Sequence, residues 1–418
     1  MVQRVDVYYE GWGEHWHWGT LATGAGPRSP ILFEYSDEAV RQGLELSPHT
    51  LKLSRGRTFS NFPEHQWQLP GLIYDALPDG WGMLLMDRLF RQRGLDLRSI
   101  TPLDRLTYIG DTAMGALSFH PVDPEVQVPV AAIALDTLAR EAQVVLAGKD
   151  SALLRQLALM GGSPQGARPK VLVYIDPVTG RMGNTDFAGA QPWLVKFPAQ
   201  DEHPEVCALE DVYAECARQC GLETPDTRYF PLGDGLAGFG AMRFDRAGGQ
   251  RVPMHTLAGY TGANYQRPGS CDYRTFQRAT WQFTKDMREV RKAFERAVFN
   301  VLFNNRDDHP KNFSYLLTET RKWVLAPAYD ITYCQGPGGW HQMDVMGAAQ
   351  SVGLRDLEGL GADAAISAAD VRQTIVRFSS VAARLSAIAR DRYPGVIRKS
   401  TLDAIQAQIN QSVEAAGR

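Results

Sequence analysis

This chain contains the stretch Asn304-Asn305-Arg306-Asp307-Asp308-His309-Pro310-Lys311-Asn312, which is followed further on by Tyr329-Asp330. Asp307 stands five residues before Asn312, and Asp330 comes 18 residues after Asn312, at the end of an apolar segment. A catalytic loop for phosphoryl transfer has this spacing. One carboxylate meets the attacking hydroxyl, while an amide and a second carboxylate hold Mg²⁺ on the nucleotide phosphates.

Apolar segments flank this loop on both sides. Residues 286–304 have apolar side chains at helical spacing, so we expect a long helix that ends at the loop. Residues 313–317 and 323–325 have strand character and predict a hairpin that leads to Asp330. A solvated turn rich in Asp and Asn is the alternative, but the apolar flanks argue against it.

The loop offers several groups for catalysis. We interpret Asp307 as the base, because only Asp307 has the five-residue offset to Asn312. Lys311 is a candidate for contacting the transferred phosphate, and His309 for bracing the loop by hydrogen bonds. Asp308 is interpreted either as a second acid or as a solvated side chain.

A glycine-rich segment upstream is a candidate phosphate cradle. Gly161-Gly162-Ser163-Pro164-Gln165-Gly166-Ala167-Arg168-Pro169-Lys170 leads into a predicted strand over 170–175. It is not a P-loop, because no Gly-Lys-Ser/Thr follows and the next element is not a helix. The positions proposed to contact the nucleotide are Gly162, Ser163, Gly166 and Lys170.

Lys196 lies in an apolar predicted strand, Trp193-Leu194-Val195-Lys196-Phe197. Such a lysine either extends to solvent at a sheet edge or points into a cleft toward an anion. Glu210 falls on the next predicted helix, over 208–220, where a kinase keeps the acid that orients its lysine. The pair therefore supplies two further parts of a nucleotide site.

Composition limits the classes of protein. With 418 residues, 44% hydrophobic and 22% charged, we expect a globular protein of two or three domains. A net charge of −3 gives no overall attraction to nucleic acid. No segment approaches the roughly 18 apolar residues of a membrane span, and the N-terminus has no signal-peptide pattern. We expect a cytoplasmic protein.

Two histidines and two cysteines have spacings that are compatible with binding a metal ion. His15 and His17 fall on one face of a predicted strand, and Cys216 and Cys220 are four residues apart on a predicted helix. Neither pair has a third ligand nearby, so strand packing and burial are the preferred interpretations. All five cysteines lack a C-x-x-C pattern, which fits a reducing compartment.

The pattern of elements predicts an α+β protein in three parts. Residues 1–135 form a small β-rich module that ends in a Pro-rich and acidic linker over 121–135. Residues 136–250 contain the glycine loop and several strands. Residues 251–418 are mostly helical and carry the catalytic loop.

Seven short motifs in this order resemble the HipA family, the serine/threonine kinase toxins of bacterial toxin–antitoxin systems. The resemblance extends over almost the full chain. It rests on Ala76–Gly80, Gly110–Phe119, the Gly161–Lys170 loop, Val195–Pro198, Arg243–Arg246, Asp307–Asn312 and Leu325–Asp330.

The resemblance implies a fold and a set of roles. The fold is a small N-terminal domain on a two-lobed, lipid-kinase-like core with a helical C-terminal lobe. Asp307 would be the base, Asn312 and Asp330 the Mg²⁺ ligands, and Lys196 a contact to the phosphates of ATP. The adenine hinge would contain Arg243, Phe244 and Asp245.

The resemblance also implies regulation and partners. Ser163 matches the serine whose autophosphorylation expels the glycine loop in this family. Pro164, Arg168, Pro169 and Asp308 depart from the usual pattern without removing a required group. The implied partners are a HipB-like helix-turn-helix antitoxin, with DNA contacted only through it, and a protein substrate such as an aminoacyl-tRNA synthetase, whose phosphorylation would arrest growth.

Two other functions remain open at the level of sequence. A catalytically degenerate kinase fold would act as a co-repressor with a DNA-binding antitoxin. A metal-dependent phosphohydrolase would use Asp307, Asp308 and His309 as metal ligands.

Overall fold

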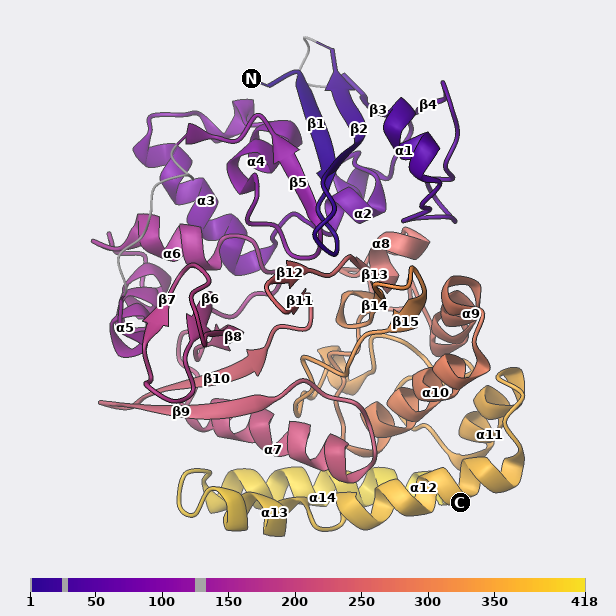
Figure 1. Cartoon of the computed structure of the whole chain (residues 1–418). Helices are drawn as coiled ribbons and strands as arrows, with labels where there is room; N and C mark the ends of the chain where they lie inside the picture. Colours follow the sequence, from indigo (N-terminus) through magenta and orange to yellow (C-terminus); the bar gives the residue numbers. More distant parts are fainter. Residues whose placement is uncertain (1, 25–28, 125–132, 418) are drawn as a thin grey trace.

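The computed structural model of the protein describes residues 2–24, 29–124 and 133–417. Residues 125–132, which belong to the predicted linker over 121–135, lie outside this description. The described chain has three main sheets, of which the first lies at one end of the molecule and the C-terminal helices at the other (Figure 1).

The N-terminal module is built on an antiparallel sheet of five strands in the order β4-β3-β2-β1-β5. In β1, the side chains of Val5, Val7 and Tyr9 are buried while their neighbours are not, as expected for a strand with one covered face. The strands are β1 Arg4–Tyr9, β2 Trp16–Thr23, β3 Ile31–Tyr35, β4 Thr58–Phe59 and β5 Leu117–His120. The helices are α1 Asp37–Gln42, α2 Gly71–Tyr74, α3 Gly80–Gln92 and α4 Pro102–Ile109, with short 3-10 turns at Glu64–Gln66 and Leu97–Ser99.

A second antiparallel sheet, in the order β7-β6-β8-β10-β9, carries the glycine loop and the strand lysine. Lys170 and Lys196 are register partners on the neighbouring strands β6 and β8. The strands are β6 Lys170–Ile175, β7 Met182–Gly183, β8 Gln191–Lys196, β9 Thr227–Gly233 and β10 Leu236–Met242. Its helices are α5 Leu135–Leu146, α6 Leu154–Gly161 and α7 Glu205–Gln219.

The rest of the chain combines a small sheet with helices. The catalytic loop connects α10 to the sheet β13-β14-β15. The strands are β11 Arg246–Ala247, β12 Gln250–Arg251, β13 Met254–Thr256, β14 Ser314–Leu317 and β15 Trp323–Leu325. The helices are α8 Leu257–Thr261, α9 Tyr273–Thr284, α10 Met287–Leu302, α11 Leu354–Asp363, α12 Ala368–Ala382, α13 Leu385–Arg392 and α14 Lys399–Ala416, with 3-10 turns at Pro310–Asn312 and Pro337–Gly339.

The predicted α+β character and the elements around the loop are confirmed. The helix expected over 286–304 is α10, and the expected hairpin is β14 and β15. The expected burial of the cysteine pair is confirmed, whereas His15 precedes β2 and is mostly exposed, so the expected strand packing applies to His17 alone. His15 and His17 lie against the ring of Tyr8, with centroids 5.0 and 5.2 Å away, and the side chains of Cys216 and Cys220 are buried.

Two large hydrophobic cores organise the molecule. The first is continuous from the N-terminal sheet through α3, α5 and α6 into strands β6 and β8. The second joins α7 to helices α9 to α14. Helix α7 thus follows the second sheet in sequence but packs into the core of the C-terminal helices, between β9 and β10 on one side and α13 and α14 on the other (Figure 1). No helix within the described residues has both the length and the apolar character of a membrane span.

The N-terminal module and the C-terminal lobe meet through closely packed backbones at α2 and α8. A Cβ atom added at Gly71 would lie 1.9 Å from the carbonyl oxygen of Gly259. Asp75, at the end of α2, accepts hydrogen bonds from Nδ1 of His255 (2.6 Å), the amide of Thr256 (2.8 Å) and the hydroxyl of Thr256 (2.7 Å). These buried contacts fix the relative position of the two parts.

We expect Gly71→Ala to lower the free energy of unfolding by about 1–3 kcal/mol, because neither backbone can move aside without breaking this junction. Val376→Ala, at a position on α12 that is 70% exposed, should change it by less than about 0.5 kcal/mol. Urea denaturation of both variants followed by circular dichroism measures the difference. Equal stability of the two variants would show that the junction tolerates extra volume.

Candidate active site

The catalytic loop is attached at its start to the helix that precedes it. The side-chain amide of Asn305 donates to Oδ1 of Asn300, one turn back in α10, at 2.9 Å. Asn304 adopts a left-handed backbone conformation with φ of 53°, and its carbonyl accepts from the amide of Cys334 at 3.1 Å. The loop therefore leaves α10 in a sharp turn and is joined to the segment that follows Asp330.

Asp307 and Asn312 face each other across this loop. The side-chain amide of Asn312 donates to the carbonyl oxygen of Asp307 at 2.8 Å, which closes the five-residue interval. The Asp307 side chain is 49% exposed, and its Oδ1 accepts from Nε2 of Gln342 at 2.7 Å. Oδ2 accepts no hydrogen bond from the described residues, so this oxygen can receive a proton from an incoming hydroxyl.

The surroundings of Asp307 favour its neutral form more than water does. Desolvation by the surrounding protein raises the pKa of this carboxyl above its ordinary value. His309 opposes the rise, while the nearby carboxylates of Asp330 and Asp308 add to it. A carboxylate with a raised pKa is a stronger base than a solvated one.

Asp308 is a buried structural residue, and the expectation that it might be solvated was wrong. Its Oδ2 accepts from the hydroxyl of Tyr273 (2.7 Å) and from Nδ1 of His341 (2.8 Å). Its Oδ1 accepts from the backbone amide of Gln342 at 2.8 Å. Asp308 thus attaches the catalytic loop to the segment that holds the side chain of Gln342 against Asp307.

His309 does not hold the loop by hydrogen bonds among the described residues. Its Nε2 lies 3.8 Å from Oδ1 of Asp307, and its Nδ1 is buried without a partner. The ring instead packs against Tyr265, with centroids 5.5 Å apart. Bracing comes from Asp308, and the influence of His309 on Asp307 is electrostatic.

Lys196 joins the second sheet to Asp330 and to α7. Its ammonium group lies 2.5 Å from Oδ1 of Asp330 and 2.5 Å from Oε1 of Glu210. Burial alone would lower the pKa of Lys196, but the two carboxylates outweigh it and raise that pKa above its ordinary value. The structure therefore brings together the strand lysine, the helix acid and the second loop aspartate, three groups far apart in sequence.

Asp330 is held in an unusual backbone conformation, with φ of 55°. Although burial opposes its ionisation, Lys196 and Lys170 hold the pKa of Asp330 well below its ordinary range. In Lys170, burial and the neighbouring Lys196 outweigh the nearby carboxylates, and they lower the pKa of its ammonium group to about 8. Asp330 is consequently a permanent carboxylate at neutral pH.

The glycine loop, residues 162–169, runs from the end of α6 to β6 and lies over these charges. Ser163 is only 4% exposed. Gly166 has φ of 105°, a backbone conformation that favours glycine. Lys170 donates to the carbonyl of Gln165, and Arg168 contacts Oε2 of Glu210 at 3.2 Å.

Lys311 has a partner that the sequence pattern did not indicate. Its ammonium lies 2.9 Å from Oδ2 of Asp79 in the N-terminal module, and 4.0 and 4.7 Å from the ring centroids of Tyr265 and Tyr74. The proposed contact of Lys311 with a transferred phosphate stays a prediction. Asp79 lies within the Ala76–Gly80 motif, but nothing in that motif indicates a partner in the catalytic loop.

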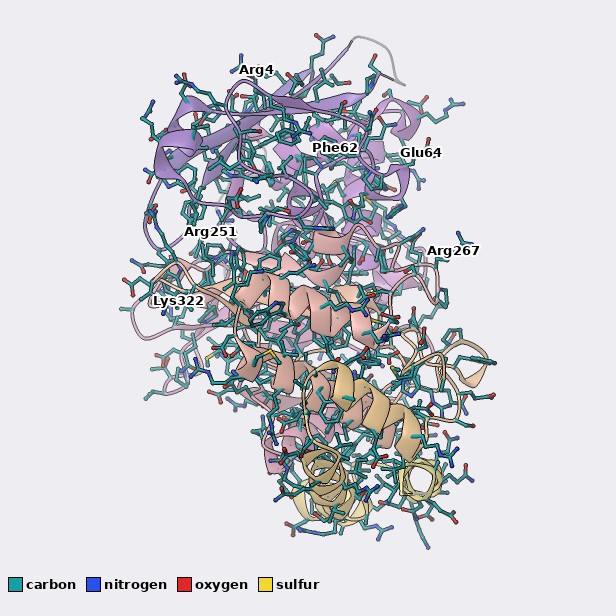
Figure 2. The ribbon with its side chains drawn as sticks, turned by 90° about the vertical axis from the view of Figure 1, so that its right-hand side faces the viewer. Arg4, Phe62, Glu64, Arg251, Arg267 and Lys322 are labelled. Carbon is teal, nitrogen blue, oxygen red and sulfur yellow. The ribbon has the colours of Figure 1, made fainter. Side chains whose placement is uncertain are left out.

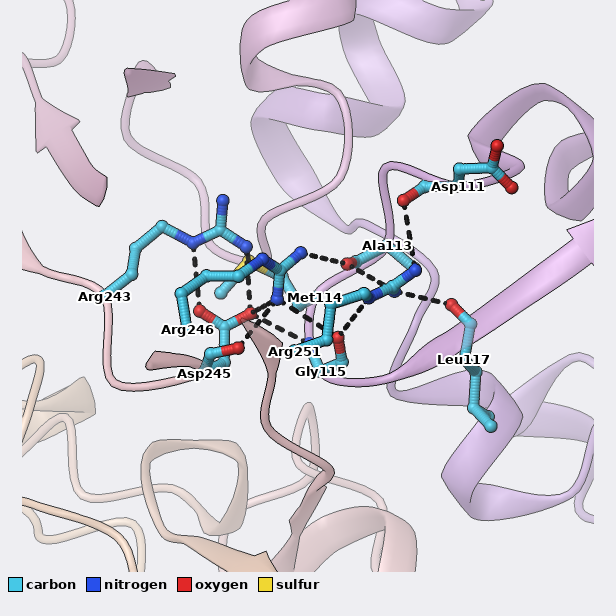
Figure 3. Close-up of polar contacts among 9 residues, drawn as sticks. All are labelled: Asp111, Ala113, Met114, Gly115, Leu117, Arg243, Asp245, Arg246 and Arg251. Atoms are coloured by element: carbon cyan, nitrogen blue, oxygen red, sulfur yellow. Dashed lines mark hydrogen bonds and ion pairs between the residues drawn. The ribbon is translucent and has the colours of Figure 1, made fainter. Parts of the chain in front are cut away.

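The segment proposed as the adenine hinge is held by a buried cluster of charges (Figure 3). Asp245 accepts from Nε and Nη2 of Arg243, each at 2.9 Å, and from Nη1 of Arg246 at 2.8 Å. It also accepts from the amide of Gly115, at 2.9 Å, in the N-terminal module. With these four bonds, the Asp245 side chain stabilises the hinge segment, and the contact of 243–245 with adenine stays a prediction.

Arg251 completes this connection from the neighbouring strand β12. It lies at the junction between the N-terminal module and the rest of the chain (Figure 2). Its guanidinium donates to backbone carbonyls of the turn over residues 111–117, those of Asp111, Ala113, Gly115 and Leu117, at 2.7 to 3.2 Å. The Gly110–Phe119 motif is therefore a docking turn for arginines of the kinase-like part.

The remaining acceptors fit a magnesium nucleotide. Asn312 uses its amide nitrogen within the loop, which leaves Oδ1 as an oxygen ligand. Asp330 uses Oδ1 for Lys196, and within the described residues its Oδ2 accepts no hydrogen bond. Amide and carboxylate oxygens are ligands that Mg²⁺ accepts together with phosphate oxygens. No cluster of three His, Cys, Asp or Glu side chains fit to hold a metal is found among the described residues.

This geometry argues against a phosphohydrolase that uses Asp307, Asp308 and His309. Asp308 already accepts three hydrogen bonds in a buried position, so it has no oxygen to offer a metal without breaking them.

Two family models match the chain. The HipA N-terminal domain matches residues 6–120, and the HipA-like C-terminal domain matches residues 162–386, more than half of the chain. The chain belongs to the HipA family. The resemblance drawn from the sequence motifs is thereby confirmed.

Individual relatives agree with this family. A protein of Sinorhizobium fredii described as "Putative kinase Y4dM" is 24% identical over 317 residues, which cover 71% of this chain and 69% of the relative. A "Putative kinase" of Haemophilus influenzae is 24% identical over 194 residues, 41% of this chain and 52% of the relative. These relatives link the HipA-family chain to kinases in general.

A solved structure shares the fold. HipA of Shewanella oneidensis, solved in a complex with HipB and operator DNA, superimposes with a TM-score of 0.70 at 15% identity, covering 99% of this chain and 97% of that one. The predicted α+β architecture, an N-terminal module on a two-lobed kinase-like core, is therefore confirmed.

The two adjacent aspartates should respond differently to substitution. Asp308→Ala leaves three donors unpaired in a buried site and should lower the free energy of unfolding by about 2–4 kcal/mol. Asp307→Asn keeps an oxygen for Gln342 and should change it by less than about 1 kcal/mol. Urea titrations of both variants test this contrast, and a larger loss in Asp307→Asn would reverse the assignment of structural and functional roles.

Proposed function

We propose that this protein is an ATP- and Mg²⁺-dependent serine/threonine protein kinase that acts as the toxin of a toxin–antitoxin pair. The observation that carries the proposal is the ion pair of Lys196 with Asp330 and Glu210. It joins the strand lysine to the carboxylate that ends the catalytic segment. Kinases use this combination to orient the nucleotide phosphates.

In the proposed mechanism Asp307 receives the proton of the acceptor hydroxyl. Gln342 holds Oδ1, so Oδ2 is turned toward the incoming group. Desolvation raises the pKa of the Asp307 carboxyl above its ordinary value, which increases its affinity for that proton.

Other groups of the chain position the nucleotide in this proposal. Lys196 contacts the phosphates, and the amides of the glycine loop add donors above them. Asn312 and Asp330 would hold Mg²⁺, which when bound neutralises charge on the phosphoryl oxygens. The segment over 243–245 would contact the adenine.

Autophosphorylation at Ser163 would switch the enzyme off. Because the Ser163 side chain is buried, its hydroxyl can reach an active site only after the loop leaves its inward position. A phosphate dianion is too large and too hydrated to return to that position. The modified loop would stay outside, and the phosphate cradle would be lost.

The proposed partners follow from the family. The Shewanella protein was solved with HipB and operator DNA, which supports a HipB-like helix-turn-helix antitoxin for this chain, with DNA contacted through the antitoxin. An aminoacyl-tRNA synthetase is the proposed type of substrate, and the cytoplasm is the proposed location.

We expect Asp307→Asn to reduce transfer of the γ-phosphate of ATP to protein at least about a hundredfold, because the general base is lost. Labelling of the purified protein and of a cell extract with γ-labelled ATP measures this. Asp37→Asn, at an exposed position of α1, is the matched control and should label like wild type. Equal labelling by wild type and Asp307→Asn would remove Asp307 as the base.

The same assay separates the kinase from a degenerate co-repressor. ATP binding in calorimetry without transfer to any protein of the extract would favour the co-repressor function.

Incubation of wild type with Mg²⁺ and ATP should add the mass of a phosphoryl group and then weaken ATP binding. Ser163→Ala should gain no phosphate on the tryptic peptide that spans residues 162–168, whereas Ser380→Ala, exposed on α12, should gain it. Intact-mass and peptide mass spectrometry provide the measurement. Phosphate on a different serine would move the switch elsewhere.

A further inference from the structure

The glycine loop rests on the N-terminal module with its backbone in direct contact. A Cβ atom added at Gly80 would lie 2.6 Å from Cα of Ala167. One added at Gly82 would lie 2.5 Å from Cβ of Pro78 and 2.9 Å from the carbonyl oxygen of Gly162. The two glycines at the start of α3 therefore permit an approach that no larger residue would allow. We call the segment Ala76–Gly82 the loop seat.

Hydrogen bonds fix the loop on this seat. The amide of Trp81 donates to the carbonyl of Gly166 at 3.1 Å, and the indole of Trp81 donates to the carbonyl of Lys170 at 3.1 Å. The side chain of Gln165 donates to the carbonyl of Asp75 at 2.9 Å. Donors therefore come from both sides of the contact, and these bonds hold the middle and the C-terminal end of the loop.

Asp79 is the residue of the seat that also reaches the catalytic loop. Its Oδ1 accepts from the amide of Gly166, and its Oδ2 accepts from the ammonium of Lys311 at 2.9 Å. One carboxylate thus joins three segments: the start of α3, the glycine loop and the catalytic loop.

Lys311 depends on Asp79 for its position. The lysine side chain is 3% exposed, and Asp79 supplies its one ion pair within the described residues. The rings of Tyr74 and Tyr265 flank the ammonium and keep water away from it. A buried ammonium without its carboxylate is strongly unfavourable, so removal of the Asp79 charge would displace Lys311.

We propose that Asp79 is a positioning residue that holds the glycine loop inward and orients Lys311, so that the N-terminal module is part of the catalytic apparatus. This inference rests on the proposed kinase function for its effect on catalysis, but its effect on the loop does not. If the glycine loop is released, Asp79 keeps its ion pair with Lys311 but loses its hydrogen bond to Gly166. If Asp79 is lost, the glycine loop and the catalytic loop both lose a contact that fixes them.

The effect of the loop seat on the glycine loop can be separated by mutation from its effect on Lys311 of the catalytic loop. Gly82→Ala crowds both Pro78 and Gly162 of the glycine loop, but it leaves the charges of Asp79 and Lys311 in place. Asp79→Asn removes the charge that both loops share, while its size and one acceptor oxygen remain. The first variant should therefore raise KM for ATP at nearly unchanged kcat, and the second should raise KM and also lower kcat.

The test compares wild type, Asp79→Asn, Gly82→Ala, Lys311→Gln and the control Asp37→Asn by three measurements. They are hydrogen–deuterium exchange of the peptide over residues 162–168, ATP affinity by calorimetry, and kcat and KM for γ-phosphate transfer. Exchange in this peptide should rise in Asp79→Asn and Gly82→Ala but not in the control. ATP affinity should fall roughly ten- to a hundredfold in Asp79→Asn, as expected for loss of charge-assisted bonds.

The double variant Asp79→Asn/Lys311→Gln tests the coupling. If Asp79 acts on catalysis through Lys311, its kcat should match that of the Lys311→Gln variant within about twofold rather than multiply the two losses. Multiplicative losses would overturn this part of the proposal, and unchanged exchange and ATP affinity in Asp79→Asn would overturn the seat itself.

Failure of the kinase proposal gives a different result. Wild type that transfers no phosphate would contradict the proposed function, while exchange and calorimetry would still report on the seat. Circular dichroism melts of each variant confirm that the fold is intact before the comparison is made.

Discussion

The architecture of this site depends on one buried ammonium group, that of Lys196. It lies between Glu210 on α7 and Asp330, so it connects the second sheet both to α7 and to the segment that follows β15. Lys196 and Glu210 are buried, Asp330 is partly exposed, and Arg168 supplies a second positive charge beside Glu210, so the buried charges have partners of opposite sign. The same cation, Lys196, holds the pKa of Asp330 well below its ordinary range. Burial lowers the pKa of Lys170 to about 8, and the charge of Lys196 adds to this effect.

Adjacent residues in the catalytic loop have opposite tasks. Asp307 is half exposed and holds one oxygen toward solvent, whereas Asp308 is buried and accepts three hydrogen bonds. The buried Asp308 helps to position Asp307, because Asp308 fixes the segment that contains Gln342, and Gln342 orients Asp307.

Much of the fold was predictable because it follows from local patterns. The apolar stripe of α10, the strands around Lys196 and the hairpin before Asp330 depend on residues close in sequence, and the structure confirms them. The contacts that were missed are long-range. Nothing in the sequence around Asp79 indicates that it pairs with Lys311, 232 residues away, and the burial of Asp308 depends on Tyr273 and His341, which come from other segments.

The family motifs marked positions in the sequence but did not show which contacts the residues at those positions make. Residues 243–245 were predicted to form the adenine hinge. The structure shows that the Asp245 side chain binds two arginines and an N-terminal amide, while the contact with adenine stays a prediction. The Gly110–Phe119 motif had no assigned task, and its carbonyls prove to be acceptors for Arg251.

The continuity of the first hydrophobic core has a consequence for the chain as a whole. One hydrophobic core contains buried side chains of both the N-terminal module, such as Val5, and the second sheet, such as Val195. Each of these two parts therefore covers apolar surface of the other. A fragment without the first 120 residues would expose the apolar faces of α5, α6 and β6 to water, and such surfaces drive aggregation. The N-terminal module is therefore not a detachable accessory, and the upper half of the molecule should gain or lose its structure as a single cooperative unit.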